Sequence, residues 1–578
     1  MGTSGARRGY KIFSINTTIR NPKRNYEFLE TFKKYDGQIM DDTNLYRYFF
    51  DLVKKGIYQF NHLPQTVKDK IESGQELSKE EVHQAISDNP QATGLNGRVM
   101  TQLRALKDLS LVSFESDDSK SSDRIITISQ LGNELLNNPK DATNVYTKIM
   151  LGLHANNPCR SKLLNKSCPF LNTLFVINEV NKRWQQLGNT PKGILLHEFA
   201  AFVLSMKDCD YKKAAEEIIK YRTKYKYGAN SSYITTYLKN YDILPLAWKS
   251  ITTDYPDEVF RKFEMTGLLI KHGKFSHTYI DFSNYNKSKV TAILENYKHY
   301  SFTKFNTPEE YYSFQSNLKL PWEISTTIKE QIVKAKAAAL KTTLDPNLPL
   351  KKQEEELDKK FFCKALQKAV DKYDEKTILT ELLILSGTHK GKSQFQDISE
   401  PLRLEYLLAL AMGKKYGTEG LVSNIIYNED GLPLHCATGG KCDIVYTSDE
   451  GCYILEPTMQ RGRDALLNSE TTNIVRHMQE EEKKTGYSYR VAMIAPYVHR
   501  DIICFFRYMQ DTKGAKILSL NIDWITHLFH SSKNILELNK NYDKLLEQSR
   551  AQEDKEEKNN PIVDFINSFK CELNIVEQ

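Results

Sequence analysis

The stretch Lys441–Glu456, KCDIVYTSDEGCYILE, decides the fold of the C-terminal half because it has the pattern of a β-hairpin. Two runs rich in β-branched and aromatic residues flank a polar turn, Ser448–Gly451. Folding about this turn predicts the register Thr447–Cys452, Tyr446–Tyr453, Val445–Ile454 and Ile444–Leu455. Asp443 then lies directly opposite Glu456. Directly opposed side chains have Cβ atoms about 5 Å apart, and like charges there destabilise the strand pair unless something compensates them.

A divalent cation is the natural compensation for this pair of carboxylates. Mg²⁺ prefers carboxylate oxygen, binds through one or two carboxylates and keeps positions free for water and phosphate. Both faces of the hairpin are otherwise apolar, which predicts a sheet covered on both sides, where an unpaired charge is costly. The pair therefore indicates metal-assisted phosphodiester chemistry at Asp443 and Glu456. The alternative is two solvated acids at a strand end.

The whole chain has the composition of a globular protein with several domains. Its 578 residues, 26% charged and 40% hydrophobic, predict three or four domains. The sequence offers neither an apolar run for a membrane span nor a secretory signal, so we expect a cytoplasmic protein without a membrane partner. The nine cysteines form no paired framework, which is typical of a reducing compartment. His435, Cys436, Cys442 and Cys452 match no common zinc-ligand spacing, so zinc is not expected.

Two basic segments predict contacts with nucleic acid. Residues 1–35 hold eight basic residues against two acidic ones, which suits a phosphate backbone. Residues 220–227, KYRTKYKY, interleave cations with aromatic side chains, as phosphate contacts and base stacking would both require. The alternative for the second segment is the solvated end of a helix.

Two segments of the first half have the pattern of a winged helix, in which a helix is followed by a short β-hairpin. The predicted elements are a helix over 94–109, strands over 111–114 and 124–128 and a helix over 130–136 in the first segment, and a helix around 260–263 with strands over 268–270 and 278–280 in the second. Winged helices often place a helix in the major groove of DNA. They also occur as protein-interaction modules, so the pattern alone leaves both functions open.

The second half begins with a helical stretch and continues as an α/β domain. Residues 326–376, rich in Lys, Glu, Ala and Leu, predict a helical linker. Residues 387–393, GTHKGKS, imitate a P-loop but are one residue short of it, so an NTPase is not expected. Residues 401–503 have the order helix, hairpin, helix, strand, helix, with strands at 490–494 and, further on, at 516–520.

Three polar side chains on the helices of this domain are candidates to join the carboxylate pair. Glu405 lies among leucines, either on a narrow polar surface stripe or buried and held by a metal or a partner group. Glu470 and His477 are seven residues apart and therefore lie on one helix face. An exposed amphipathic helix would show the same spacing.

The motifs around these residues resemble one family. The series CDIVY, YILEPT, ETTNIVRH and VAMIAP resembles the AlwI-type group of type IIS restriction endonucleases, the AlwI, PleI and MlyI group, which includes related nicking enzymes. The opening YKIFSINTTIRNPKR, residues 10–24, is similar to the N-terminal start of that family. The resemblance touches both ends of the chain and covers most of it in domain order.

The resemblance implies a multidomain α+β fold. Its expected parts are a winged-helix-like DNA-recognition region over 1–300 with subdomains at about 87–140 and 190–290, a helical linker over 301–376, and a C-terminal α/β nuclease domain of the PD-(D/E)xK class over 377–578. The resemblance also implies that the catalytic positions are Glu405, Asp443, Glu456, Glu470 and His477, with Mg²⁺ bound by Asp443 and Glu456. Thr458 departs from the class because it stands where the E-x-K motif has lysine; His477 and Arg461 are the candidates to replace it.

The function that the resemblance implies is an Mg²⁺-dependent type IIS restriction endonuclease. It would bind a short asymmetric sequence of double-stranded DNA and cut at a fixed distance outside it. With one catalytic centre per chain, double-strand cleavage requires transient homodimerisation or two successive events, and a chain that fails to dimerise is a nickase. A cognate DNA methyltransferase in the host is also implied. The candidate DNA contacts are Arg20, Lys23, Arg24, Arg98 and Gln102. The alternatives are a sequence-specific DNA-binding protein without cleavage activity and a structure-specific repair nuclease.

Overall fold

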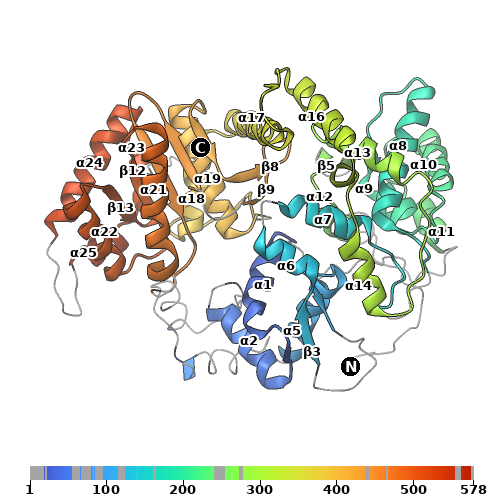
Figure 1. Cartoon of the computed structure of the whole chain (residues 1–578), viewed down its shortest axis with the longest axis horizontal. Coiled ribbons are helices and arrows are strands. Elements are labelled where there is room, and N and C mark those ends of the chain that lie inside the picture. Colours follow the sequence, from blue (N-terminus) through green and yellow to red (C-terminus); the bar gives the residue numbers. More distant parts are fainter. Residues whose placement is uncertain are drawn as a thin grey trace. The chain divides into compact units, whose positions relative to one another are not determined.

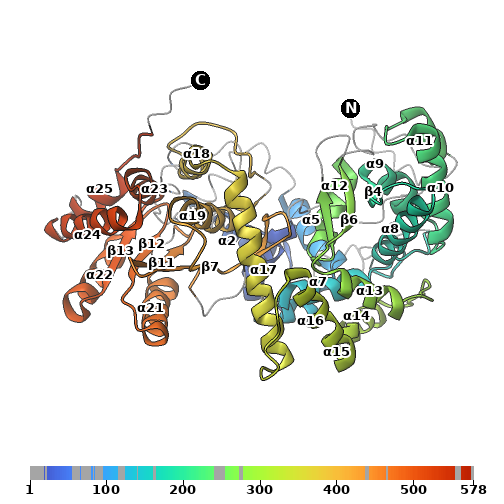
Figure 2. The same cartoon turned by 90° about the horizontal axis from the view of Figure 1, so that it is seen from above.

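The computed structural model describes most of the chain as two compact units (Figures 1 and 2). The described residues are 22–54, 95–114, 124–138, 141–159, 165–239, 254–272, 278–396, 398–436, 442–461, 466–552 and 561–573, with a few isolated positions between these ranges. Unit 1 comprises Met1–Leu45 and Asn96–Asp358, and unit 2 comprises Tyr46–Leu95 and Lys359–Gln578. Helices and several small sheets together confirm a multidomain fold of mixed α and β structure. Among the helices described, none is both long and apolar enough to cross a membrane.

The first part of unit 1 contains the first predicted helix–hairpin segment. The predicted elements are confirmed as α5 (Leu95–Asp108), β2 (Val112–Ser113), β3 (Ile125–Ile128) and α6 (Gln130–Asn137). The loop between the two strands, 115–123, lies outside the described residues. β1 (Gln38–Ile39), which the sequence did not predict, pairs with β3 and gives a sheet of order β1-β3-β2. The helices that precede or follow these elements are η1 (Pro22–Arg24), α1 (Asn25–Phe32), η2 (Lys33–Tyr35) and α7 (Ala142–Leu151), and α2 (Asp42–Lys54) begins in unit 1 and continues into unit 2.

The second predicted segment also forms a helix and a hairpin. α12 (Tyr255–Glu264) is followed by β5 (Leu269–His272) and β6 (Tyr279–Phe282), and β4 (Ile194–Leu195) adds a third strand in the order β4-β6-β5. The other elements of this part are α8 (Pro169–Gln186), α9 (Leu196–Glu198), the π-helix η5 (Phe199–Leu204), α10 (Tyr211–Tyr225) and α11 (Ser231–Lys239).

The chain enters β4 through a glycine that no other residue could replace without strain. Gly193 has φ +64°, and a Cβ atom built on it would lie 1.9 Å from the carbonyl oxygen of Ile280 on β6. Both the left-handed backbone and this close approach require glycine. The position of β4 beside β6 therefore depends on Gly193.

The predicted helical stretch consists of α16 (Thr326–Leu340) and α17 (Leu350–Lys372). Lys336 of α16 is buried and donates to Glu354 at 2.9 Å and to Asp358 at 2.8 Å, both on the first half of α17. Lys289 lies 3.3 Å from the same Glu354 carboxylate. This cluster of opposite charges fastens α16 and α17 to α13 (Lys287–Asn296). The short helices α14 (Pro308–Asn317) and α15 (Pro321–Ile324) lie between α13 and α16 in the chain.

The core of unit 2 is a five-stranded mixed sheet of order β13-β12-β11-β10-β7. β10 pairs antiparallel with β7 and with β11, whereas β11–β12 and β12–β13 are parallel. The strands are β7 (Leu421–Ser423), β10 (Ile444–Thr447), β11 (Cys452–Pro457), β12 (Arg490–Ile494) and β13 (Lys516–Leu520), with a separate ribbon of β8 (Ile425–Tyr427) and β9 (Pro433–Cys436). The hairpin and the strands at 490–494 and 516–520 were predicted, whereas β7, β8 and β9 were not.

Helices cover both faces of this sheet, as the apolar pattern of the hairpin predicted (Figure 2). On one face, Ile444 and Leu455 pack with α18 (Glu375–Ser386), α19 (Glu400–Tyr416), α23 (Ile522–Ser531) and α24 (Ile535–Ala551). On the other face, Val445 and Ile454 pack with η8 (Leu466–Glu470), α21 (Thr471–Thr485), α22 (Arg500–Lys513) and α25 (Pro561–Asn567). Successive side chains of a strand alternate between the two faces, so the position of a residue in its strand determines which of the two cores its side chain joins.

The stretch that imitates a P-loop folds back on α18. Gly387 ends this helix in a left-handed conformation. The Ser393 hydroxyl donates to the Glu381 carboxylate at 2.5 Å, and the amide of Gln394 donates to the same carboxylate at 2.9 Å. Glu381 therefore occupies these two donors, the Ser393 hydroxyl and the Gln394 amide.

Candidate active site

β10 and β11 form the predicted hairpin in the predicted register. Ile444 pairs with Leu455, and the amide of Ser448 closes the turn by donating to the Gly451 carbonyl at 3.2 Å. Asp443 immediately precedes β10 and Glu456 lies near the end of β11. By strand alternation both belong to the face that α21 covers.

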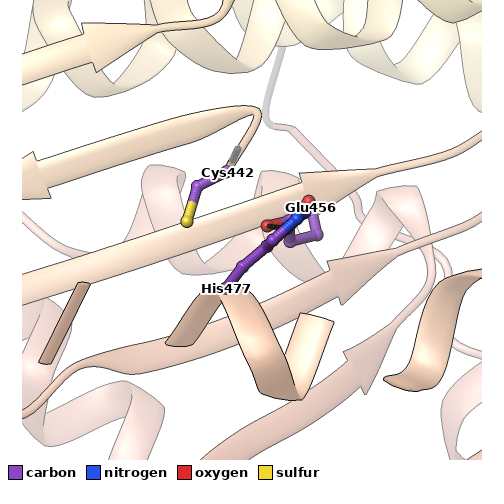
Figure 3. A group of neighbouring side chains, drawn as sticks. All are labelled: Cys442, Glu456 and His477. Carbon is purple, nitrogen blue, oxygen red and sulfur yellow. Dashed lines mark hydrogen bonds and ion pairs between the residues drawn. The ribbon is translucent and has the colours of Figure 1, made fainter. Parts of the chain in front are cut away.

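A histidine from α21 reaches the carboxylate on β11. Nδ1 of His477 lies 3.0 Å from Oε1 of Glu456, and each side chain is only 7% exposed (Figure 3). The other ring nitrogen, Nε2, is buried and has no hydrogen-bond partner among the described residues. When Nδ1 carries the proton and donates it to Glu456, Nε2 presents a lone pair that can accept a proton. Glu456 therefore orients the imidazole for use at Nε2.

Burial and mutual repulsion shift the pKa values of the acids in this cluster. Burial, followed by the charges of Glu456 and Glu470, holds the pKa of Asp443 well above its usual range. Burial and the charge of Glu470 likewise raise the pKa of Glu456. Burial raises the pKa of Glu470, although His477 opposes this shift, and burial lowers the pKa of His477. Since each of these groups is affected by another, the fold brings together four of the five predicted catalytic side chains.

The cluster suits a divalent cation. Asp443 and Glu456 share a hydrogen bond, which requires that one of the two carboxyl groups retain a proton. A cation bound between them would replace that proton and offset the charges of Glu456 and Glu470, which raise the pKa of Asp443. Carboxylate oxygens are the ligands that Mg²⁺ prefers, so the donor set fits the ion implied by the sequence.

Cys442 is a neighbour that the sequence did not predict. Its sulfur, a carboxylate oxygen of Glu456 and a ring nitrogen of His477 all lie within 4.8 Å of one another, and all three residues are buried (Figure 3). A signal was available, since Cys442 directly precedes Asp443 in the chain. The cysteine spacing matches no common zinc motif, and the proximity of Cys442 to His477 depends on how α21 packs on the sheet.

Glu405 is buried on α19, with 8% of its surface exposed. This excludes the alternative of a solvated surface stripe. The neighbouring leucines of α19 belong to the core on the sheet face opposite to Glu456. Glu405 does not belong to the group of possible metal ligands formed by Cys442, Glu456 and His477.

Thr458, at the position of the missing lysine, is held by the backbone of the sheet. Its amide donates to the Ile494 carbonyl at 2.8 Å, and its hydroxyl accepts from the amide of Gln460 at 3.1 Å. The carbonyl of Arg461 contacts Nε2 of His499 at 2.8 Å. Of the two candidates to replace lysine, His477 contacts the carboxylate pair through Glu456.

The five predicted DNA contacts all belong to the N-terminal part of the chain. Arg20 and the side chain of Lys23 lie outside the described residues. Arg24 precedes α1, where it pairs with Glu27 at 3.5 Å and covers the ring of Phe28. On α5, Arg98 is exposed, whereas Gln102, one turn further on, is half-buried. Their contact with DNA stays a prediction.

The basic segment 220–227 is only partly available for DNA, which corrects the prediction for its central residues. Arg222 is buried on α10 and donates from Nε and Nη2 to the carboxylate of Glu198 at 2.8 and 2.6 Å. Tyr221 is also buried, whereas Lys224 is exposed. Tyr221 and Arg222 are buried where α10 packs on η5, and the buried carboxylate of Glu198 compensates the charge of Arg222. The alternative of a solvated helix end is therefore wrong for these two residues.

Comparison with known proteins places this site in a family context. A family model described as AlwI restriction endonuclease matches residues 110–527. No curated protein matches the chain. Among solved structures, the small subunit (R.BspD6I2) of the heterodimeric restriction endonuclease R.BspD6I is 22% identical, with a TM-score of 0.25 over 30% of this chain and 88% of that one. The restriction endonuclease FokI is 8% identical, with a TM-score of 0.20 over 91% of this chain and 74% of that one. Both TM-scores are too low to support any further argument.

Proposed function

Because the chain belongs to the AlwI restriction endonuclease family, we propose that it is a type IIS restriction endonuclease of Mg²⁺-dependent mechanism. It binds a short asymmetric sequence of duplex DNA and hydrolyses phosphodiester bonds at a fixed distance outside that sequence. The observation that carries this proposal is the group formed in unit 2 by buried Glu456 and His477 with half-buried Asp443 and Glu470. Grouping acids with raised pKa values away from water destabilises the fold, and a purely structural role does not require such a group.

Asp443 and Glu456 are the residues that would hold Mg²⁺, together with the carbonyl of Pro457. When bound, the ion supplies Lewis-acid polarisation of the phosphoryl group and lowers the pKa of a coordinated water. Glu470 adds negative charge at the same place and orders the carboxylate pair. Glu405, which is buried on α19, stays a proposed catalytic position on the resemblance alone.

His477 is the residue that we assign to proton transfer. Its Nδ1 proton is engaged by Glu456, so Nε2 can accept the proton of the attacking water or hold it in line with phosphorus. The lowered pKa of His477 keeps the imidazole neutral near pH 7, as a proton acceptor must be. This assignment accounts for a site in which Thr458 occupies the usual lysine position.

Recognition and cleavage would be divided between the two parts of the chain. We assign DNA recognition to a region over 1–300 with winged-helix subdomains at about 87–140 and 190–290, a helical linker to 301–376 and a PD-(D/E)xK nuclease domain to 377–578. Within the described residues one such acidic cluster is present, so cutting both strands requires transient homodimerisation or two successive nicks. A matching methyltransferase would protect the host's own DNA.

Cleavage of unmethylated supercoiled plasmid in Mg²⁺ and in EDTA, followed by run-off sequencing, tests the proposal. We expect Mg²⁺-dependent ends at a constant offset from one short sequence. Asp443→Ala and Glu456→Ala should abolish cutting and leave specific DNA binding nearly intact. Glu450→Gln removes an exposed acid from the turn of the same hairpin and should cut normally.

Two outcomes of this experiment would indicate a function other than the proposed one. Specific binding with an intact plasmid in both conditions would indicate a DNA-binding protein that does not cleave. Cleavage confined to flaps or mismatches would indicate a repair nuclease.

A further inference from the structure

The donor atoms of Cys442, Glu456 and His477 form a group that Mg²⁺ does not need (Figure 3). A sulfur, a carboxylate oxygen and a ring nitrogen lie within 4.8 Å of one another, and the three side chains are buried. Mg²⁺ is held by oxygen ligands and has little use for a thiol or an imidazole. Zn²⁺ binds this mixture of ligands, often through three protein groups with the fourth position open.

The spacing of the group is close to that of a tetrahedral ion. With the usual Zn–N, Zn–O and Zn–S bond lengths, ligand atoms around tetrahedral Zn²⁺ are separated by about 3.3 to 3.6 Å. Nδ1 of His477 and Oε1 of Glu456 are already 3.0 Å apart, and the longest separation in the group is within 4.8 Å. Binding would therefore require the Cys442 sulfur to approach by about 1 Å, which a side-chain rotation can provide.

We propose that this group is a second metal site, which takes Zn²⁺ or a similar thiophilic cation through Cys442, Glu456 and His477 and thereby blocks the Mg²⁺-dependent reaction. The proposal rests on the proposed function. Glu456 serves both sites, so occupation by Zn²⁺ removes a carboxylate from Mg²⁺. Cys442 has no part in the Mg²⁺ site and serves only the second one.

Binding changes the protons of the three ligands in a defined way. The Cys442 thiol gives its proton to solvent as the sulfur–metal bond forms, and any proton held on Glu456 also leaves. His477 binds through Nδ1, so the proton that Nδ1 carried is replaced by one on Nε2, and the ring stays neutral. Nε2 then no longer has the lone pair that accepts a proton from water. Zn²⁺ would therefore inhibit cleavage in two ways, by taking the Glu456 carboxylate from Mg²⁺ and by removing the proton acceptor at Nε2 of His477.

The test uses the purified full chain, freed of metal with EDTA and then titrated with Co²⁺, a spectroscopic substitute for Zn²⁺. Co²⁺ bound to a thiolate gives a sulfur-to-metal charge-transfer band in the near ultraviolet. We expect this band in the wild type and in Cys452→Ser. Cys452 is a matched control because it is a buried thiol of the same hairpin and the same core, outside the ligand group.

Cys442→Ser should lose the band and bind Zn²⁺ at least tenfold more weakly in competition with a chelating dye. Cys442→Ala gives the same comparison should the serine variant fold poorly, as judged by circular dichroism. In plasmid cleavage with Mg²⁺, half-inhibition of Cys442→Ser should require at least tenfold more Zn²⁺ than half-inhibition of the wild type.

An unchanged band and unchanged Zn²⁺ affinity in both Cys442 variants would overturn the proposed metal site. This failure differs from failure of the proposed function. A wild type that shows the thiolate band but never cleaves with Mg²⁺ would refute the nuclease and leave the metal site standing. If the wild type cleaves DNA with Mg²⁺ but the Cys442 variants bind Zn²⁺ as tightly as the wild type does, the metal site is refuted and the nuclease stands.

Discussion

Replacing Arg222 by methionine tests whether this residue belongs to the core of unit 1 or to a DNA-binding surface. The side chains of Arg222 and Glu198 are 1% and 0% exposed, and two hydrogen bonds of 2.8 and 2.6 Å join them. Arg222 also donates to the Gly193 carbonyl at 2.7 Å, at the start of β4. Methionine keeps much of the length of the side chain and removes the charge. Glu198 would then be buried without its cation.

The expected cost is large because removal of one partner leaves the other charge uncompensated. Breaking a buried ion pair in this way costs roughly 3–5 kcal/mol. The double variant Glu198→Met/Arg222→Met should be less destabilised than Arg222→Met alone, since no buried charge remains. The control is Arg183→Met on α8, whose pair with Glu179 is 30% and 17% exposed. Loss of that surface pair should cost about 0–1 kcal/mol.

Hydrogen exchange of peptides from α8 and α10 during denaturant titration measures the free energy of unfolding of this part separately, because a chain of several domains does not unfold in one step. Binding to cognate DNA should be unchanged in Arg222→Met under conditions where unit 1 is still folded. A cost below about 1 kcal/mol together with weakened DNA binding would refute the reasoning. It would assign Arg222 to DNA contact, as its sequence context suggested.

Three further predictions concern catalysis, acid stability and backbone strain. His477→Gln keeps a donor for Glu456 but cannot accept a proton, so single-turnover cleavage should slow by about 10²–10⁴-fold while DNA affinity is retained; wild-type rates would contradict the assigned role. Although burial alone would raise it, Lys289 and Lys336 lower the pKa of Glu354 from 4.5 to about 2. A lowered folded-state pKa stabilises the protein above the unfolded value, and this stability is lost as the pH falls from 4.5 through about 2, so unit 1 should lose about 3 kcal/mol in that range. Glu354→Gln should abolish most of this dependence in pH-dependent unfolding curves. Gly193→Ala should destabilise the α8–α10 region by about 2 kcal/mol or more, measured by the same hydrogen exchange, because of its positive φ and its contact with Ile280; a neutral effect would argue against this backbone.

The hairpin could be predicted residue by residue because its information is local. A two-residue period, a polar turn and two acids at equal distances from that turn determine one register. The strand β7, which completes this part of the sheet, has only three residues, and β1 and β4 have two each. Such short strands are selected by pairing with distant segments rather than by their own pattern, so the sequence alone could not identify them.

The site could be predicted in part for the same reason. The seven-residue spacing of Glu470 and His477 predicts one helix face, and in the structure Glu470 ends η8 and His477 lies on α21, which follows directly. The hairpin supplies Asp443 and Glu456. Cys442 was missed because its contact with His477 depends on how α21 packs on the sheet. The pattern of the basic segment does not show that Arg222 is buried, because the compensating acid, Glu198, lies 24 residues away in the chain.

The alternation of the two cores across β11 also bears on how the chain avoids misfolding. Leu455 faces the leucines of α19, and the next residue, Glu456, faces α21. If β11 slipped by one position against β10 or β12, every side chain would change face. The carboxylate would then enter an apolar core without cation or imidazole. The acidic pair that weakens the native sheet therefore acts as a check on strand alignment, because the misaligned sheet would be weaker still.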